Sequence, residues 1–262
     1  MSANLRNKIL LYFDEGSSST DALHNMLQRH FLSKNVSIGT VNADEIKENA
    51  LDEQVLALFI GGGYADSYWK KLHPQGNKKI KEFVQKGGFY VGICGGAYYG
   101  CKHIEFDADV PQSNIKTDST LGLLEATAKG TLYEKFGIAP FARNPDSVAI
   151  PTVKWLPDDG KHAVYYHGGC SFVPDKNSTT VETLAVYDGI DGELPAIVKG
   201  RYGEGLVIAS GVHPEKTGDL LAKLVDFHRS NTRFVENAQL LAEKEPERRI
   251  LERKFLNLLM ER

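Results

Sequence analysis

Short apolar runs alternate with helix-like segments over roughly the first hundred residues of the chain. The apolar runs are compact and carry few charges, which is typical of strands buried on both faces of a sheet. They lie at residues 8–13, 36–41, 55–60 and 89–93. Between them, apolar residues recur at helical spacing from Leu23 to Phe31, and polar helices are predicted around 44–49 and 77–86. The alternation predicts an α/β fold with a mostly parallel central sheet and helices on both faces.

The pattern changes in the middle of the chain, between about residues 104 and 200. Helical periodicity weakens there, and short β-like runs lie between turn signals. These runs are residues 148–150, 163–166, 181–187 and 196–199. Gly203, Glu204 and Gly205 then separate two further strand-like runs, which is typical of a hairpin turn. We therefore expect antiparallel strands added to the parallel sheet.

From Thr217 onward the pattern is helical again, and the end of the chain is charged with one apolar stripe. The stripe consists of Ile250, Leu251, Phe255, Leu258 and Leu259. A helix packed on the core explains this stripe most simply, and binding to a partner is the alternative. We therefore predict one domain over residues 1–230 and a helical extension over 231–262 packed on it.

Composition and charge exclude some classes of function. Apolar residues make up 42% and charged residues 25% of the 262 residues, and the formal net charge is -3. This balance gives no electrostatic reason to expect nucleic acid or a membrane as a partner. The apolar run near the N-terminus is too short for a signal peptide or a membrane span. Three cysteines in a chain of this length are not typical of a disulfide framework, so we expect free thiols and a cytoplasmic protein.

One of these cysteines, Cys94, lies in a glycine-rich turn between a predicted strand and a predicted helix. The local sequence is Gly-Ile-Cys-Gly-Gly. Such a sharp turn can present a nucleophile at the edge of a sheet, and the glycines relieve crowding around it. The start of the helix would also favour negative charge on the sulfur. The alternative is that Cys94 is a small buried apolar residue beside a packing turn.

A second segment with catalytic potential follows the strand-like run at 206–210. His213 and Glu215 lie there in the sequence Gly-Val-His-Pro-Glu. A nucleophilic thiol needs a base within hydrogen-bond reach, and that base needs a third group to fix its tautomer. Two residues apart in an extended stretch, the two side chains lie on the same side. In isolation they would indicate only a surface turn, but together with Cys94 they predict a Cys-His-Glu triad.

These motifs resemble those of the class I glutamine amidotransferases, α/β proteins of flavodoxin-like architecture. In that family a Cys-His-Glu triad hydrolyses the side-chain amide of glutamine to glutamate and ammonia. The chain resembles still more the amidotransferase-like N-terminal region of eukaryotic-type biotin-protein ligases. This resemblance rests on the segments YFDEG, FIGGGY, GICGGAYYG, HGGC and GVHPE, and it covers most of residues 8–228.

By this resemblance, Cys94 would be the nucleophile, His213 the base and Glu215 the group that orients the base. The resemblance also implies three glycines as sources of N–H donors to an oxyanion: Gly62 or Gly63, with Gly95. These roles predict a cysteine-dependent amidotransferase or amide hydrolase that acts on a small-molecule amide through a thioester, without a cofactor. A synthetase or ligase that uses the ammonia would be a separate chain, because no part of the sequence is left over for it.

Two departures from these families limit what the resemblance implies. Ala97, Tyr98 and Tyr99 occupy the place where glutamine-using amidotransferases commonly have a Gln or a similar residue, so glutamine is one candidate among small amides. The Gly-Arg-Gly-Arg signature of biotin ligases is absent, so the chain should not make biotinyl-adenylate by itself. Two alternatives stay open: a non-catalytic ligand-binding or regulatory module, and another hydrolase, such as a peptidase.

Further residues are expected to line the same pocket. Tyr166 and His167 follow a strand-like run, and Tyr98 follows the cysteine turn. Structural packing of His167 explains its presence equally well. No Cys-x-x-Cys or His-x-x-x-His spacing supports a metal site. Cys101 is expected on the helix that follows Cys94, buried against the core.

Overall fold

A computed structural model describes residues 6–107, 114–138 and 147–260 of the chain. Its main feature is a nine-stranded sheet with the order β2-β1-β3-β4-β13-β12-β11-β8-β9. The first five of these strands run parallel to one another. They are β2 (Ser37–Val41), β1 (Lys8–Tyr12), β3 (Val55–Ile60), β4 (Phe89–Ile93) and β13 (Gly205–Ser210). The apolar runs of the sequence predict all five strands to within a residue at either end.

The other four strands extend the sheet in the antiparallel sense. They are β12 (Pro195–Tyr202), β11 (Glu182–Tyr187), β8 (Thr152–Trp155) and β9 (Gly160–Ala163). The turn between β12 and β13 lies at Gly203 and Glu204, as the sequence predicts. Gly203 has a φ of 61°, a left-handed conformation that a glycine adopts without steric penalty.

Two of the β-like runs predicted in the middle of the chain are not strands of this sheet. Residues 148–150 lie outside any strand, and only the first residue of the run 163–166 belongs to β9. The two runs meet instead through an isolated bridge between Ala149 and Tyr166. The short apolar pattern therefore indicates buried, extended backbone without a continuous ladder.

A second, four-stranded sheet with the order β10-β7-β5-β6 is not predicted by the sequence. Its strands are β10 (Cys170–Pro174), β7 (Leu124–Gly130), β5 (Cys101–Phe106) and β6 (Ile115–Thr117). The expected position of Cys101 on a helix is wrong, because helix α5 (Gly95–Gly100) ends one residue earlier and Cys101 begins β5. Cys101 is fully buried, as expected.

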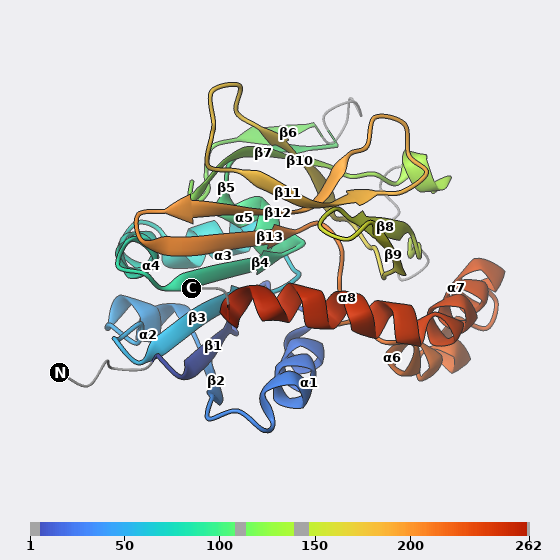
Figure 1. The fold of residues 1–262 in the computed structure, drawn as a ribbon, viewed down its shortest axis with the longest axis horizontal. Coiled ribbons are helices and arrows are strands. Elements are labelled where there is room, and N and C mark those ends of the chain that lie inside the picture. Colours follow the sequence, from blue (N-terminus) through green and yellow to red (C-terminus); the bar gives the residue numbers. More distant parts are fainter. Residues whose placement is uncertain (1–5, 108–113, 139–146, 261–262) are drawn as a thin grey trace.

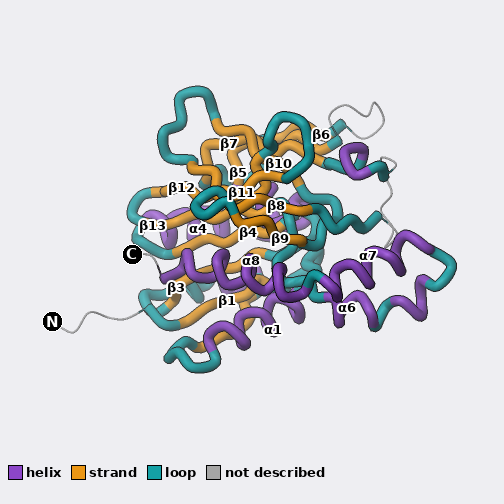
Figure 2. Tube along the Cα trace, turned by 45° about the vertical axis from the view of Figure 1, so that its right-hand side comes forward, coloured by secondary structure: helices purple, strands orange, loops and turns teal. Residues whose placement is uncertain are grey.

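Helices cover both faces of the nine-stranded sheet (Figure 1). Helices α1 (Thr20–Phe31) and α8 (Glu245–Asn257) lie side by side on one face (Figure 2). Their apolar side chains share one core with the strands. The opposite face packs against α5, the second sheet and three more helices. These are α2 (Ala43–Lys47), α3 (Ala65–Leu72) and α4 (Gln75–Gln85), of which α3 is not predicted by the sequence. The predicted fold class is therefore confirmed.

The chain ends in a helical segment. It contains α6 (Gly218–Ala222), α7 (Thr232–Glu243) and α8, with the short 3-10 turns η2 (Val225–His228) and η3 (Leu258–Met260). A further 3-10 turn, η1 (Glu134–Phe136), lies in the middle of the chain. Of the predicted apolar stripe, Ile250 is 38% exposed, so its expected place in the core is wrong. Its other four members are buried against the sheet. The division of the chain at residue 230 stays a prediction.

No helix in the described ranges is long and apolar enough to cross a membrane.

Candidate active site

Cys94 lies at the junction between β4 and α5, at the carboxyl edge of the parallel strands. Its φ of 50° and ψ of -109° place a residue with a Cβ atom in a sparsely populated conformation. The N–H group of Cys94 donates to the carbonyl of Ser210 at 2.8 Å, which ties the turn to the end of β13. Backbone held in such a conformation is characteristic of functional sites, where the surrounding structure maintains the strain.

The glycines around Cys94 allow a close approach of the loop that follows β3. A Cβ atom on Gly95 would lie 2.3 Å from the carbonyl oxygen of Gly63, and one on Gly96 would lie 1.9 Å from the carbonyl oxygen of Ile60. Neither distance is possible for a real side chain, so both positions require glycine. The glycine-rich loop therefore lies directly against the first turn of α5.

His213 and Glu215 follow β13, the strand paired with β4. The Nδ1 atom of His213 lies 2.7 Å from Oε1 of Glu215, and both side chains are buried. The backbone N–H of His213 donates to the carbonyl of Tyr165 at 2.9 Å, and the Tyr165 ring packs edge-on against the imidazole. With Glu215 ionised, the pair fixes the proton of the imidazole on Nδ1.

Burial and charge act against each other in this pair. Burial alone would lower the pKa of His213, but the Glu215 carboxylate and the neighbouring Cys94 raise that pKa to about 10. Burial would likewise raise the pKa of Glu215, yet His213 holds it below its ordinary value. The Nε2 atom of His213 is buried and has no hydrogen-bond partner among the described residues.

The structure thus brings together the three residues that the sequence singles out. Cys94 and His213 follow neighbouring strands, and Glu215 is bound to the far side of the imidazole. The other two thiols have different surroundings, because Cys101 and Cys170 are fully buried and burial raises the pKa of each. Cys94 is 8% exposed, which makes it the most accessible of the three cysteines.

The three glycines predicted to donate to an oxyanion lie beside these residues. A Cβ atom on Gly62 would lie 3.0 Å from Cε1 of His213, which places Gly62 against the imidazole. Gly63 has a φ of 140° and contacts Gly95. Within the described residues, the N–H groups of Gly62 and Gly63 have no hydrogen-bond acceptor, and Gly95 opens α5, where helical N–H groups lack intrahelical partners.

The segment after β9 covers the thiol more closely than the sequence predicts. The Sγ atom of Cys94 lies 3.5 Å from the carbonyl oxygen of His167, to which it can donate. The hydroxyl of Tyr98 donates to the carbonyls of Gly168 at 3.3 Å and Gly169 at 3.1 Å, and that of Tyr166 donates to Gly169 at 3.0 Å. Tyr98 and Tyr166 are therefore buried behind this segment and hold it against Cys94.

The sequence does not predict this cover, because every residue has a backbone carbonyl and no residue type marks the one that lies over the thiol. The available signal was the glycine pair in His-Gly-Gly-Cys, which allows a tight turn. Gly168 has a φ of 68°, and a Cβ atom on Gly169 would lie 1.7 Å from the carbonyl oxygen of Gly211. Both glycines are needed for the segment to approach the strand ends. The substrate-binding roles of Tyr98, Tyr166 and His167 stay predictions.

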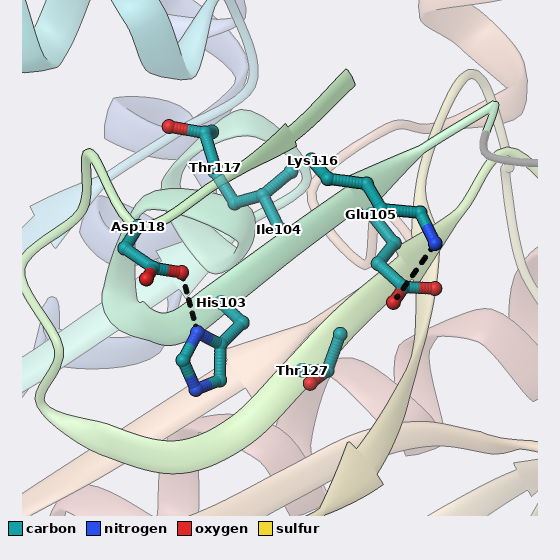
Figure 3. Close-up of a pocket in the computed structure, with 7 residues that line it drawn as sticks. All are labelled: His103, Ile104, Glu105, Lys116, Thr117, Asp118 and Thr127. Carbon is teal, nitrogen blue, oxygen red and sulfur yellow. Dashed lines mark hydrogen bonds and ion pairs between the residues drawn. The ribbon is translucent and has the colours of Figure 1, made fainter. Parts of the chain in front are cut away.

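A surface pocket of about 610 Å³ lies elsewhere, on the second sheet (Figure 3). Its lining residues are His103, Ile104, Glu105, Lys116, Thr117, Asp118 and Thr127. His103 is paired with Asp118 at 2.5 Å and Lys116 with Glu105 at 3.7 Å, so its charged groups already have partners. In the part of the chain that the structure describes, no three His, Cys, Asp or Glu side chains are grouped as a metal site requires.

Known proteins share sequence with this chain over most of its length. The family model "Biotin-protein ligase, N terminal" matches residues 7–261. An uncharacterized protein of Chlamydia muridarum (strain MoPn / Nigg) is 30% identical over 212 residues, which cover 79% of this chain and 80% of the relative. The biotin-protein ligase of Schizosaccharomyces pombe (strain 972 / ATCC 24843) is 27% identical over 177 residues, which cover 67% of this chain and only 28% of that ligase.

Among solved structures, a glutamine amidotransferase is similar to this chain with a TM-score of 0.52 and 21% identity. The match covers 88% of this chain and 98% of that protein. At this level of identity the likeness shows the fold alone. The resemblance inferred from the motifs is confirmed in both respects, because the fold is amidotransferase-like and the family match spans nearly the whole chain. This chain belongs to the biotin-protein ligase N-terminal family.

Proposed function

We propose that this chain is a cysteine-dependent amidotransferase or amide hydrolase with Cys94 as nucleophile, His213 as proton carrier and Glu215 as its orienting partner. One observation carries the proposal. The strained turn at Cys94 follows β4, and the buried His213–Glu215 pair follows β13, the strand next to it. A thiol, an imidazole and a carboxylate in this order are the elements of nucleophilic acyl transfer. The amidotransferase-like fold supports the assignment as an analogy.

The geometry suggests a sequence of steps. We propose that the Cys94 thiol gives its proton to His213, that the resulting thiolate bonds to an amide carbonyl carbon, and that N–H groups of Gly62 or Gly63, with Gly95, stabilise the oxyanion. The raised pKa of His213 keeps its imidazole protonated at neutral pH, so it can give a proton to the leaving nitrogen as the C–N bond breaks. Water then attacks the thioester, and His213 takes the proton that the water loses. The products are a carboxylic acid and an amine or ammonia, and the thiolate–imidazolium pair is regenerated.

The substrate we propose is a small-molecule amide, with glutamine as one candidate. The matched fungal ligase is more than three times longer than the matched segment, because that segment covers 28% of it. We propose that ammonia released here passes to a separate synthetase or ligase chain. Three buried, unpaired cysteines fit a reducing compartment, and we propose the cytoplasm.

An amide-hydrolysis assay tests this function. Ammonia release from glutamine and from other small amides would be measured for the wild type, for Cys94→Ala and for Cys101→Ala. Turnover that Cys94→Ala abolishes and Cys101→Ala preserves is the expected result, since Cys101 is fully buried and is separated from Cys94 by helix α5. Wild-type turnover that survives Cys94→Ala would contradict the assigned nucleophile.

The cover over the thiol favours a second candidate, a non-catalytic ligand-binding or regulatory module of the same family. The carbonyl of His167 accepts from Sγ and leaves Cys94 only 8% exposed. A module of this kind would bind a small ligand saturably and would form no thioester with any amide. Equilibrium binding of a glutamine analogue, measured alongside trapping of acylated protein by mass spectrometry, separates the two candidates.

A further inference from the structure

Arg248 on α8 is a fully buried arginine, and its side chain is satisfied at every nitrogen. The Nε and Nη2 atoms each donate to the carboxylate of Glu245 at 2.7 Å, and Nη1 donates to Glu252 at 2.7 Å. Burial would lower the pKa of Arg248, but these two carboxylates raise it, so the guanidinium stays charged. Glu252 is also bound by Arg29 of α1 at 3.2 Å. A guanidinium with fixed partners on both sides is a rigid donor.

The remaining contact of this guanidinium leads to the active site. Nη1 of Arg248 also donates to the carbonyl oxygen of Pro214, across 34 residues of sequence. Pro214 is the residue between His213 and Glu215. Its carbonyl belongs to the peptide unit that joins it to Glu215, so the hydrogen bond fixes the plane of that peptide. The orientation of that plane determines where the Glu215 side chain begins.

We propose that Arg248 is a positioning residue for the His213–Glu215 pair, and that α8 thereby forms part of the active site's supporting structure. The inference rests on the proposed function for its catalytic meaning. No hydrogen bond or ion pair among the described residues joins Arg248 to the imidazole or to the Glu215 carboxylate, so the Pro214 carbonyl is its link to the pair. Catalytic geometry is sensitive to support of this kind, since a misplacement of about 1 Å can reduce a rate by about a hundredfold.

The charge of Arg248 and its geometry must be separated in the test. Removing the charge would leave the carboxylates of Glu245 and Glu252 without their counter-charge, and this would raise the pKa of a nearby imidazole. Arg248→Lys keeps the charge but replaces the planar fork with an ammonium, which cannot hold both carboxylates and the carbonyl in the same geometry. Arg249→Lys is the matched control, because Arg249 lies on the same helix and pairs with the same Glu245, yet is 58% exposed.

The deciding measurement is the titration of His213 by NMR in the full chain, with its signal assigned among the eight histidines by His213→Gln. A loosened Glu215 raises the pKa of His213 less, so Arg248→Lys should lower the titration midpoint by about one pH unit, a tenfold change in the protonation equilibrium. Arg249→Lys should leave the midpoint unchanged. A folded Arg248→Lys protein with the wild-type midpoint, or a higher one, would overturn the inference.

Circular dichroism establishes that each variant is folded. Should Arg248→Lys not fold, Glu252→Asp takes its place with the same expectation, because it keeps the negative charge and withdraws one of the carboxylate oxygens that fix the guanidinium. The rate at which an electrophile modifies Cys94, measured as a function of pH, is the second readout and should fall about tenfold or more in the positioning variant. A wild type whose Cys94 is unreactive would contradict the proposed function, while the His213 titration would still decide the role of Arg248.

Discussion

Cys94 has a backbone conformation that a residue without a Cβ atom would adopt more easily. Strain of this kind amounts to about 1–3 kcal/mol, and here it is maintained by the hydrogen bond to Ser210 and the packing of the adjacent glycines. A cysteine is therefore present although its backbone conformation would suit glycine better. Its presence at such a position favours a role for its side chain. Such conflicts between local preference and observed residue are expected at functional sites.

This strain predicts an unusual order of stability at one position. Glycine normally destabilises a protein relative to alanine by about 0.5–1 kcal/mol because it loses more backbone entropy on folding. At Cys94 the order should be reversed, with Cys94→Gly more stable than Cys94→Ala by about 1 kcal/mol. Urea unfolding of the two variants measures the difference. A glycine variant less stable than the alanine variant would show that the turn is unstrained.

The His213–Glu215 pair predicts a pH-dependent contribution to stability. The pKa of His213 is raised from 6.5 to about 10, so the pair's contribution is complete below about pH 6.5 and is lost as the pH rises towards 10. The lowered pKa of Glu215 means that the contribution is also present above pH 4.5 and is lost as the pH falls through that lowered value.

Glu215→Ala should therefore lower the free energy of unfolding by about 3 kcal/mol near pH 6, because it leaves a buried imidazolium without its partner. The difference from the wild type should shrink as the pH approaches 10. Denaturant unfolding of both proteins across this range measures it. A difference that stays constant with pH would indicate that His213 is neutral throughout.

At the scale of elements, the cover over the thiol depends on Tyr98 of α5. Removing its hydroxyl in Tyr98→Phe frees the carbonyls of Gly168 and Gly169 from one donor and should lower stability by about 1 kcal/mol. We expect alkylation of Cys94 to become severalfold faster. Tyr99→Phe is the matched control, since Tyr99 lies on the same helix and its hydroxyl bonds to Asn77 instead. Equal alkylation rates in the two variants would contradict the role given to Tyr98.

The elements differ in how well the sequence predicts them, for a physical reason. β3 is buried at all of its six positions, so its apolar run is unmistakable. In β7 the buried positions are Leu124, Ala126, Ala128 and Gly130. Small residues give almost no alternation signal, and the second sheet was missed for this reason. The short helix α5 ends at Gly100, and nothing in the local pattern shows that Cys101 begins a strand.

The candidate site residues likewise divide into those that the sequence marks and those that it does not. Cys94, His213 and Glu215 could be predicted because each has a reactive side chain and follows a strand. The carbonyl of His167 over the sulfur carries no signal in a sequence. Arg248 lies in a segment so rich in Glu, Arg and Lys that it resembles a solvated helix face, and only the packing of α8 shows that the side chain is buried.

At the scale of the whole molecule, α8 forms one face of the core as well as supporting the Pro214 carbonyl. Leu251 is fully buried between the helix and the sheet, whereas the adjacent Ile250 is 38% exposed. Leu251→Ala should lower the free energy of unfolding by about 3 kcal/mol, and Ile250→Ala by less than about 1 kcal/mol. Thermal or urea unfolding of both variants tests this. Similar losses of unfolding free energy in the two variants would contradict the close packing of α8 against the sheet.

The central claim is that Cys94 is an activated nucleophile, and one measurement tests it most directly. The intact, folded chain would be incubated with a diazo-ketone analogue of glutamine and analysed by mass spectrometry with peptide mapping. We predict one adduct per chain, on Cys94, because Cys101 and Cys170 are fully buried with raised pKa values. A folded protein that carries no adduct, or one labelled at Cys101 or Cys170 instead, would contradict the account.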